Sequence, residues 1–149
     1  MKSKNVLIIG GGISGCGAAI LSYELGYNTF LTSKSKIEKN RKKILIDKGV
    51  EFSEGAHSLS YLSNTDLIIK SPGVSPKISF LKEARKQKIP NYKDAENYYL
   101  KALSFDKNHV GALEYLGELY VETDRRDEAL VLLNRIKLVA GDKSSEYKD

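Results

Sequence analysis

The sequence predicts an α/β protein, in which a Rossmann-like parallel sheet domain is followed by a short, all-helical segment. Three observations support this prediction. A buried-type strand, a glycine-rich turn and an apolar helix follow one another between residues 5 and 26. Short β-branched runs then alternate with amphipathic stretches up to residue 90, which is typical of parallel sheets. From residue 91 onward the pattern is helical and recurs with a 34-residue period.

The glycine-rich turn is the feature that most directly indicates a function. Val6 to Ile9 form an apolar run, after which Gly10, Gly12 and Gly15 fit the pattern G-x-G-x-x-G. Glycines allow the backbone to approach a phosphate, and the free N–H groups and dipole of the following helix attract the anion. We therefore predict phosphate binding at this turn. The alternative is a tight turn that binds nothing.

Composition places the chain among globular proteins, because its 149 residues are 41% hydrophobic and 29% charged. A single cysteine excludes an internal disulfide, and no apolar stretch approaches the length of a membrane span. Met1 to Lys4 lead directly into a strand rather than into a secretory signal. We expect a cytoplasmic location and no membrane partner.

Charge divides the chain into two parts that differ in kind. Residues 1–90 carry fifteen Lys and Arg against seven Asp and Glu, a net charge of +8, whereas residues 91–149 carry nine against twelve, a net charge of −3. The basic helix candidate at residues 36–48 has no interleaved aromatic residues and no accompanying recognition motif. We interpret it as a solvated face and expect no nucleic-acid partner.

The second expected strand covers residues 27–32, and the loop that follows it helps to distinguish between nucleotide ligands. NAD and FAD sites usually place an acidic side chain there, but this chain has Thr32, Ser33 and Lys34. Such a site is therefore disfavoured. An NADP site, with Ser33 and Lys34 holding the 2′-phosphate, and a nucleotide bound in another orientation both stay open.

A further buried-type strand, residues 66–70, ends at Ser71, Pro72 and Gly73. In an open parallel sheet, ligands collect outside the carboxyl ends of the strands near the point where the strand order reverses. We therefore expect these residues to line one crevice together with the turn of residues 10–15.

No catalytic or metal-binding residue stands out. His57 lacks an evident metal partner, because the other histidine, His109, lies in the second part of the chain. Cys16 has no nearby His or acid in the sequence and is interpreted as a small packing residue.

The end of the sheet is less regular than its beginning. Ser75 as cap and Pro76 at the first helical position predict a helix through Lys88. A fifth strand should follow, but residues 91–96 lack the apolar content of a buried strand. We therefore predict an α/β domain over residues 1–90 that is truncated at its last strand.

Four segments in order, IIGGGISG, LTSK, EGAH and KSPGVSP, resemble the N-terminal domain of the Mur ligase family, closest to its D-glutamate-adding members, over residues 4–90. The resemblance implies that this domain binds the UDP end of UDP-N-acetylmuramoyl-L-alanine or a related UDP nucleotide. It assigns the diphosphate to backbone groups of Gly12, Ile13, Ser14 and Gly15, and the uridine to the surroundings of Thr32, Ser33, Ser71 and Gly73. Family members often have an acidic residue where Thr32 stands.

The full-length Mur ligases use ATP and Mg²⁺ in further domains. This chain contains no G-x-x-x-x-G-K-[ST] phosphate loop. We therefore expect that the chain alone binds neither cofactor and does not ligate.

The helical part resembles the tetratricopeptide repeat family. Ala95, Tyr99 and Ala102 recur 34 residues later as Ala129, Leu133 and Ile136, and the stretch ALSFDKNHVGALEYLGELY carries the resemblance. It implies three helices over residues 91–140, with small Ala and Gly positions that allow close helix packing, followed by a polar tail at residues 141–149. Such repeats bind proteins or peptides, but about three are usually needed, so a helical appendage is the alternative.

Three functions remain in view at this point. UDP-precursor binding is preferred. The alternatives are an NADP-binding oxidoreductase fragment and a protein-interaction adaptor that uses the helices of residues 91–140. The junction between the two parts has no Gly, Ser or Pro-rich linker, and it leaves a natural and an artificial fusion both open.

Overall fold

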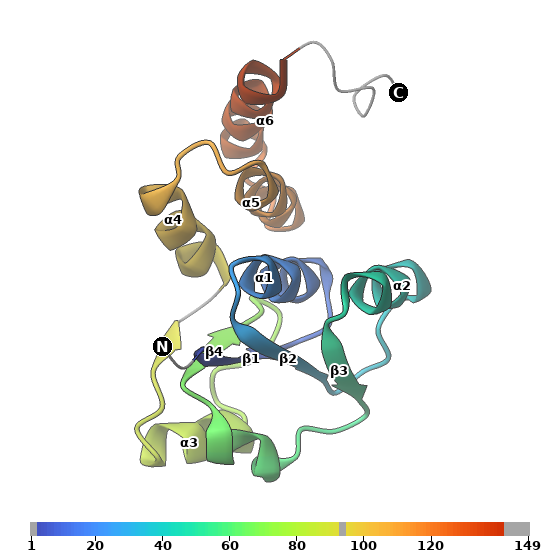
Figure 1. Ribbon diagram of the computed structural model, residues 1–149, viewed down its shortest axis with the longest axis vertical. Coiled ribbons are helices and arrows are strands. Elements are labelled where there is room, and N and C mark those ends of the chain that lie inside the picture. The colour runs from blue at the N-terminus through green and yellow to red at the C-terminus, as the bar shows by residue number, and fades with distance from the viewer. Residues whose placement is uncertain (1–2, 93–94, 142–149) are drawn as a thin grey trace. The chain divides into compact units, whose positions relative to one another are not determined.

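The computed structural model describes residues 3–92 and 95–141 of the chain. The chain forms two compact units that divide between Tyr98 and Tyr99 (Figure 1). The sequence pattern changes earlier, at residue 90. The two units are described separately below.

The first unit is built on a five-stranded, fully parallel sheet with the order β3-β2-β1-β4-β5. The strands are β1 (Asn5–Ile9), β2 (Asn28–Ser33), β3 (Glu51–Glu54), β4 (Leu67–Lys70) and β5 (Asn91–Tyr92). In the central strand, Ile9 lies opposite Thr32 on one side and Lys70 on the other. The carboxyl ends of these three strands therefore meet at one edge, and the order reverses between β1 and β4.

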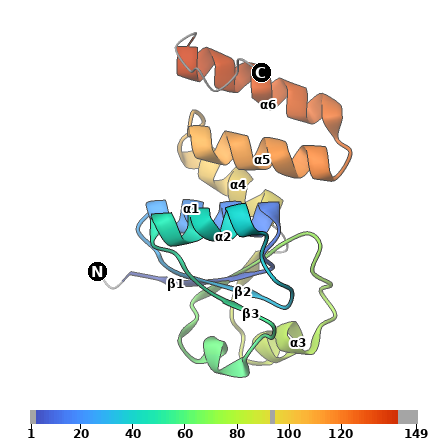
Figure 2. The same cartoon turned by 90° about the vertical axis from the view of Figure 1, so that its right-hand side faces the viewer.

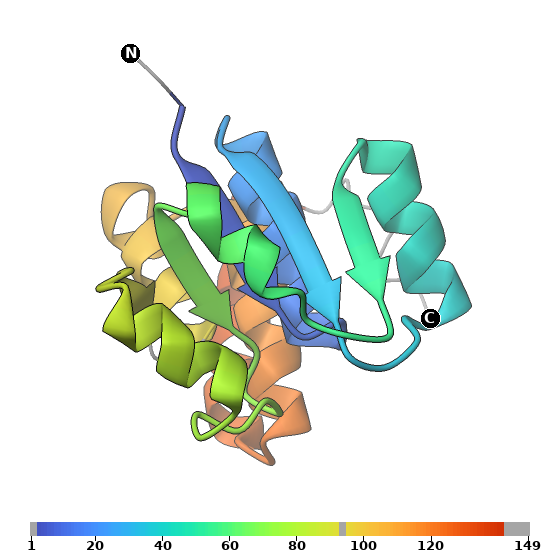
Figure 3. The same ribbon diagram turned by 90° about the horizontal axis from the view of Figure 1, so that it is seen from below.

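Helices cover both faces of this sheet. The helices α1 (Ile13–Glu24) and α2 (Lys39–Lys48) lie on one face (Figures 1 and 2), and the 3₁₀ helix η1 (Leu59–Asn64) and α3 (Ser79–Lys86) lie on the other (Figure 3). Because both faces are covered, the apolar run of β1 is fully buried, as the sequence predicts. The core on the α3 side contains Leu7, Ile9, Leu62, Ile68, Phe80, Leu81 and Ala84.

The predicted start of α3 at Pro76 is wrong, because the helix begins at Ser79 with Ile78 as its N-cap. Ser75 instead closes a separate turn. Its Oγ accepts a hydrogen bond from the Lys77 N–H at 3.2 Å, and its carbonyl accepts one from the Ile78 N–H at 3.5 Å. The serine and proline signal is real, but it marks this turn rather than the helix.

The prediction that the sheet lacks its last strand also needs correction. Residues 91–92 form β5, which pairs in parallel with β4, and the Ile68 N–H donates to the Pro90 carbonyl at 2.9 Å. A sheet ladder is made by backbone groups, so a short edge strand forms without the apolar side chains that a central strand needs.

The second unit is helical. Its helices are α4 (Ala95–Phe105), which begins in the first unit, α5 (Val110–Glu122) and α6 (Arg126–Ala140). The three predicted helices are thus confirmed. The helices α5 and α6 pack side by side (Figure 2), and their buried residues are Ala112, Leu113, Leu116, Leu119, Tyr120 and Ile136.

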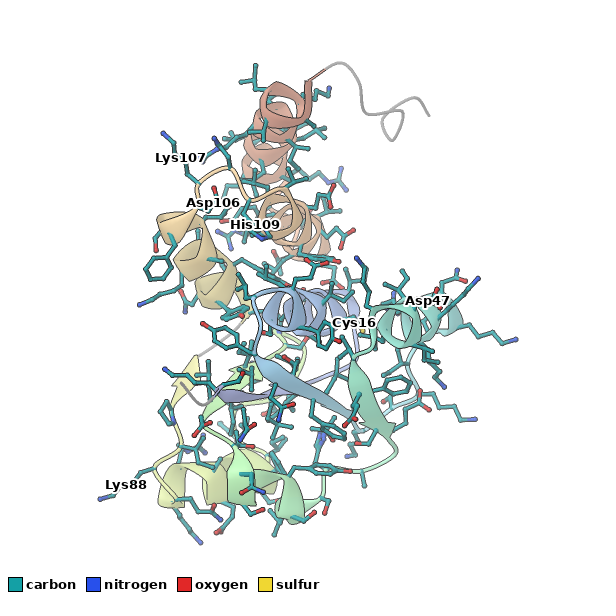
Figure 4. The ribbon with its side chains drawn as sticks, viewed as in Figure 1. Cys16, Asp47, Lys88, Asp106, Lys107 and His109 are labelled. Atoms are coloured by element: carbon teal, nitrogen blue, oxygen red, sulfur yellow. The ribbon has the colours of Figure 1, made fainter. Side chains whose placement is uncertain are left out.

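The turn between α4 and α5 is closed by its own side chains, and Figure 4 shows Asp106, Lys107 and His109 there. Asp106 Oδ1 accepts a hydrogen bond from the Asn108 N–H at 3.1 Å, and His109 Nδ1 accepts one from the Ala112 N–H at 3.2 Å. His109 is therefore the N-cap of α5 and not a metal ligand candidate.

Gly117 does not serve the close helix approach that the sequence suggested. A Cβ placed on it would find no atom within 4 Å. Close packing is made instead by Ala112, which is fully buried. Among the described residues, no helix is long and apolar enough to cross a membrane.

Candidate functional site

The glycine turn connects the buried end of β1 to the N-terminus of α1. Gly10 has a φ of 107°, which only glycine adopts readily, and Gly12 is the N-cap of α1 without a side-chain cap. The first backbone bond of the helix runs from the Cys16 N–H to the Gly12 carbonyl at 3.0 Å. The N–H groups of the first turn therefore have no acceptor within the helix, and the positive end of the helix dipole lies there.

Three of the glycines are required by the packing of the turn itself. A Cβ on Gly15 would lie 1.8 Å from the Gly10 carbonyl oxygen, and one on Gly10 would lie 2.6 Å from Ser71 Cβ. A Cβ on Gly11 would lie 2.6 Å from Ile37 Cγ1. The turn is thus held closely by its neighbours on three sides.

Gly12 differs from these three glycines. It is exposed, has a φ of −75°, and a Cβ on it would find no atom within 4 Å. Its backbone is therefore the part of the turn that an external group can approach, at the N-terminus of α1 where the helix dipole is positive.

The loop after β2 is fixed by internal hydrogen bonds. Thr32 is completely buried, and its Oγ1 lies 2.9 Å from His57 Nδ1 and accepts a hydrogen bond from Ser53 Oγ at 3.3 Å. Ser33 is also buried, and its hydroxyl donates to the Ser35 carbonyl at 2.7 Å. Lys34, by contrast, is exposed. Thr32 and Ser33 therefore shape the loop, and Lys34 extends from it.

The sequence analysis found no metal partner for His57 and missed its position beside Thr32. The ring lies against Phe80, with 5.5 Å between the ring centroids. Partial burial lowers the pKa of His57 below its usual value, and the positive charge of Lys34 lowers it further. Its neutral form is therefore favoured, and its hydrogen bond with Thr32 joins the loop after β3 to the end of β2.

The loop after β4 is held by a buried lysine that the sequence analysis did not single out. Lys70 is only 7% exposed, and its Nζ donates to the Ser71 carbonyl at 3.1 Å and to the Val74 carbonyl at 2.8 Å. The Ser71 N–H also donates to the Ile9 carbonyl at 2.8 Å. These bonds bring Ser71 against the glycine turn and leave Pro72 and Gly73 exposed.

Glu54 at the end of β3 is a second positioning residue that the sequence analysis missed. Its Oε1 accepts a hydrogen bond from the Ile37 N–H at 2.8 Å and forms an ion pair with Lys42 Nζ at 2.8 Å. The hydrogen bond from Lys42, followed by that from the Ile37 N–H, lowers the pKa of the Glu54 carboxyl. Glu54 thereby holds Ile37 against Gly11.

Cys16 is a packing residue, as expected. Its Sγ donates a weak hydrogen bond to the Gly11 carbonyl at 3.4 Å, and Figure 4 shows it on the side of α1 that faces α2. Burial raises the pKa of the thiol to about 11, against the lowering effect of Arg41. The thiol is therefore protonated at neutral pH and is a poor nucleophile. Within residues 3–92 and 95–141, no group of three His, Cys, Asp or Glu is placed to hold a metal.

A cavity of about 260 Å³ lies elsewhere in the first unit. It is lined by the amino ends of β1, β2 and β3 and by η1, and it includes Asn5, Asn28 and Tyr61. The glycine turn lies at the opposite ends of these strands. This cavity is therefore not part of the candidate site.

Comparison with known families gives two matches. The family model for the MurD N-terminal domain matches residues 6–80, and the model for a tetratricopeptide repeat matches residues 90–149. Among curated proteins, the chain is 40% identical over 83 residues to UDP-N-acetylmuramoylalanine–D-glutamate ligase from Christiangramia forsetii, which covers 54% of this chain and 19% of the ligase. It is 36% identical over 97 residues to the ligase of the same name from Cytophaga hutchinsonii, which covers 65% and 22%. The chain thus spans about a fifth of the length of these relatives.

Solved structures show the same fold. The Mur ligase MurC from Thermotoga maritima aligns with a TM-score of 0.59 and 22% identity, which covers 71% of this chain and 24% of MurC. A pseudomurein peptide ligase from Methanothermus fervidus aligns with a TM-score of 0.57 and 21% identity, which covers 65% and 20%. At this identity the likeness concerns the fold.

Proposed function

Because this chain belongs to the MurD N-terminal domain family, we propose that its first unit binds the UDP end of UDP-N-acetylmuramoyl-L-alanine or a related UDP nucleotide. The observation that carries the proposal is the contrast within the glycine turn. Gly10, Gly11 and Gly15 are closed in by neighbours, and only Gly12 faces open space at the N-terminus of α1. A diphosphate carries the charge and the acceptor oxygens that this position suits.

The proposal gives each part of the site a physical role. The backbone N–H groups of Ile13, Ser14 and Gly15 donate to the diphosphate, where the helix dipole favours negative charge. Lys34 and Gly73, which are exposed on the loops after β2 and β4, flank the uridine. Buried residues position these loops rather than contact the nucleotide through their side chains: Thr32, Ser33, Lys70 and Ser71.

We further propose that the chain contributes nucleotide binding to a D-glutamate-adding ligase, as the names of its relatives suggest. Ligation requires activation of a carboxylate by ATP, with Mg²⁺ and cationic side chains to carry the charge. The sequence has no phosphate loop for ATP. In this proposal the residues of this chain bind and orient the nucleotide and take no part in making the bond.

The test is calorimetric titration of the whole chain with UDP-N-acetylmuramoyl-L-alanine, and with UDP, NADP and NAD in parallel. The decisive variant is Gly12→Val, because a side chain there meets no neighbouring atom, yet it occupies the space that the diphosphate needs. Gly117→Val is the matched control, since its Cβ also meets no neighbouring atom but lies in the second unit.

We expect saturable binding of the muramoyl nucleotide that Gly12→Val abolishes and Gly117→Val preserves. Tighter binding of NADP would instead support an oxidoreductase fragment. Absence of nucleotide binding by the folded chain would contradict the proposal and would leave an adaptor role for the helices.

A further inference from the structure

One arginine lies on the inward face of α2, where helices usually carry apolar residues. Leu45, one turn further along the helix, is completely buried, and residues four apart share one face of a helix. Arg41 therefore faces the interior of the first unit together with Leu45. The residue is half-buried, and its Nε atom is shielded from solvent.

The guanidinium of Arg41 lacks a partner. Among the described residues, its buried Nε has no hydrogen-bond acceptor, and no carboxylate forms an ion pair with the guanidinium. Two carboxylates of this region are already engaged. Glu38 accepts a hydrogen bond from the Asn40 N–H at 3.0 Å as the N-cap of α2, and Glu54 pairs with Lys42 at 2.8 Å. A buried donor without an acceptor is uncommon and costly, so it requires an explanation.

Arg41 lies beside the first turn of α1. Ile37, which directly precedes the N-cap of α2, packs so closely on the glycine turn that a Cβ on Gly11 would lie 2.6 Å from its Cγ1. Burial raises the pKa of Cys16 in α1, and the nearby charge of Arg41 opposes this effect. Helical side chains lean toward the N-terminus of their helix. Because α1 and α2 both follow the carboxyl ends of parallel strands, Arg41 leans toward the glycine turn.

Two positive features therefore meet at the start of α1. The N-terminal end of a helix carries a partial positive charge of roughly half a unit. The first turn of α1 contains no acidic residue, and its N-cap, Gly12, has no side chain to accept a hydrogen bond. Arg41 adds a full positive charge that is partly removed from water, which is costly unless a counter-charge lies close by. An anion at the first turn of α1 would supply that counter-charge to both features.

We propose that Arg41 is a phosphate ligand of the nucleotide site, and that its guanidinium donates to the diphosphate held at the N-terminus of α1. This inference rests on the proposed function and adds a side-chain contact to it. A rotation of the arginine side chain allows Nε and one Nη to form two parallel hydrogen bonds to one phosphate group. The unpaired Nε thereby gains an acceptor, so the bound anion removes a cost that the free chain carries.

Arg41→Met in the whole chain tests the proposal, with UDP and uridine as ligands. Affinity for UDP should fall about tenfold or more, because a pair of charge-assisted hydrogen bonds is lost, and affinity for uridine, which has no phosphate, should not change. The free energy of unfolding without ligand should not fall, since methionine suits the inward face and leaves no donor unpaired. Lys43→Met is the matched control, because Lys43 is exposed on the same helix. It should keep UDP affinity within about twofold.

The contrary outcomes are distinguishable. If Arg41→Met binds UDP as tightly as the original chain, Arg41 is not a ligand, and the proposed function stands without it. Equal losses of UDP and uridine affinity, together with a lower free energy of unfolding, would assign Arg41 a structural role instead. An equal loss in Lys43→Met would mean that net charge, rather than Arg41, attracts the anion. Absence of UDP binding by the folded original chain would contradict the proposed function itself, and the role of Arg41 with it.

Discussion

In the first unit a Cβ on Gly15 would lie 1.8 Å from a backbone oxygen, whereas in the second unit a Cβ on Gly117 would meet no atom within 4 Å. Glycine is therefore required for steric reasons at Gly15, whereas no described neighbour requires it at Gly117. At Gly15 the lack of a side chain is required for the turn to exist. At Gly117 no described residue occupies the space that a side chain would take. Glycine is also among the least favourable residues inside a helix.

Buried polar groups show the same contrast. Among the described residues, the buried polar or charged ones all lie in the first unit: Ser14, Ser22, Thr29, Thr32, Ser33, Lys70 and Ser71. Four of these stand at the carboxyl ends of β2 and β4, around the glycine turn. Burial of a polar group is costly unless it is hydrogen-bonded, and the side chains of Thr32, Ser33 and Lys70 are hydrogen-bonded within the loops that they hold.

The largest expected effect is at Gly15. Gly15→Ala should destabilise the first unit by about 3 kcal/mol or more, because the methyl group would collide with backbone that cannot move without breaking the turn. Urea unfolding followed by circular dichroism measures the change. Gly12→Ala, which meets no neighbour, should leave stability within about 0.5 kcal/mol. Equal effects of the two variants would remove the distinction between closed and open glycines.

The second expected effect concerns Lys70, a buried polar residue of the first unit. Lys70→Met should lower the free energy of unfolding by about 2 kcal/mol, because the Ser71 and Val74 carbonyls lose a charged donor. The exposed Lys77 is the control, and Lys77→Met should change stability little. If Lys70→Met is as stable as the original chain, the buried amine does not hold the loop.

Gly117 provides a test of the difference between required and unrequired glycines in the second unit. Gly117→Ala should stabilise that unit by about 1 kcal/mol, since alanine is the better helix former and space is open. The thermal midpoint of helix melting reports it. A lower midpoint would mean that another helix approaches this glycine closely in solution.

The smallest effect concerns pH and His57. Because the pKa of His57 is lowered in the folded state, the unfolded state takes up the proton first. The contribution of His57 to stability is therefore complete above the unfolded pKa of about 6.5 and is lost as the pH falls below it. Stability measured from pH 7.5 to pH 5.5 should fall, and His57→Gln should reduce that slope. An unchanged slope would place the pH response on other groups.

An element of the fold could be predicted from the sequence when residues near it in the chain determine it. The strand, glycine turn and helix of residues 5–24 are set by neighbours in the chain, and their presence and order were predicted correctly, although α1 begins at Ile13, inside the glycine pattern. Ser75 and Pro76 gave a local signal with two readings, a turn or a helix start, and tertiary structure chose the turn. The edge strand at residues 91–92 depends on backbone pairing with β4, which no local apolar pattern reports.

The candidate site could be predicted only in part from the sequence, because only some of its features depend on local signals. Residues on the three loops could be proposed because parallel strands end at one edge. Three features of the site depend on contacts between residues distant in sequence or on loop geometry. Thr32 is buried beside His57, the Lys70 amine turns inward to two carbonyls, and Glu54 holds Ile37. A lysine at the end of a strand normally suggests a solvent-facing side chain.

The position of β1 in the middle of the sheet has a consequence for the time course of folding. Val6 pairs with Thr29 on one side and with Leu67 on the other, so the first strand to be synthesised must wait for the fourth before both of its edges are satisfied. In the second unit, α5 and α6 are separated by residues 123–125 alone and can pair as soon as they emerge. Folding slows as contacts become more distant in sequence. The helix pair of α5 and α6 should therefore fold faster than the sheet that precedes it in the chain.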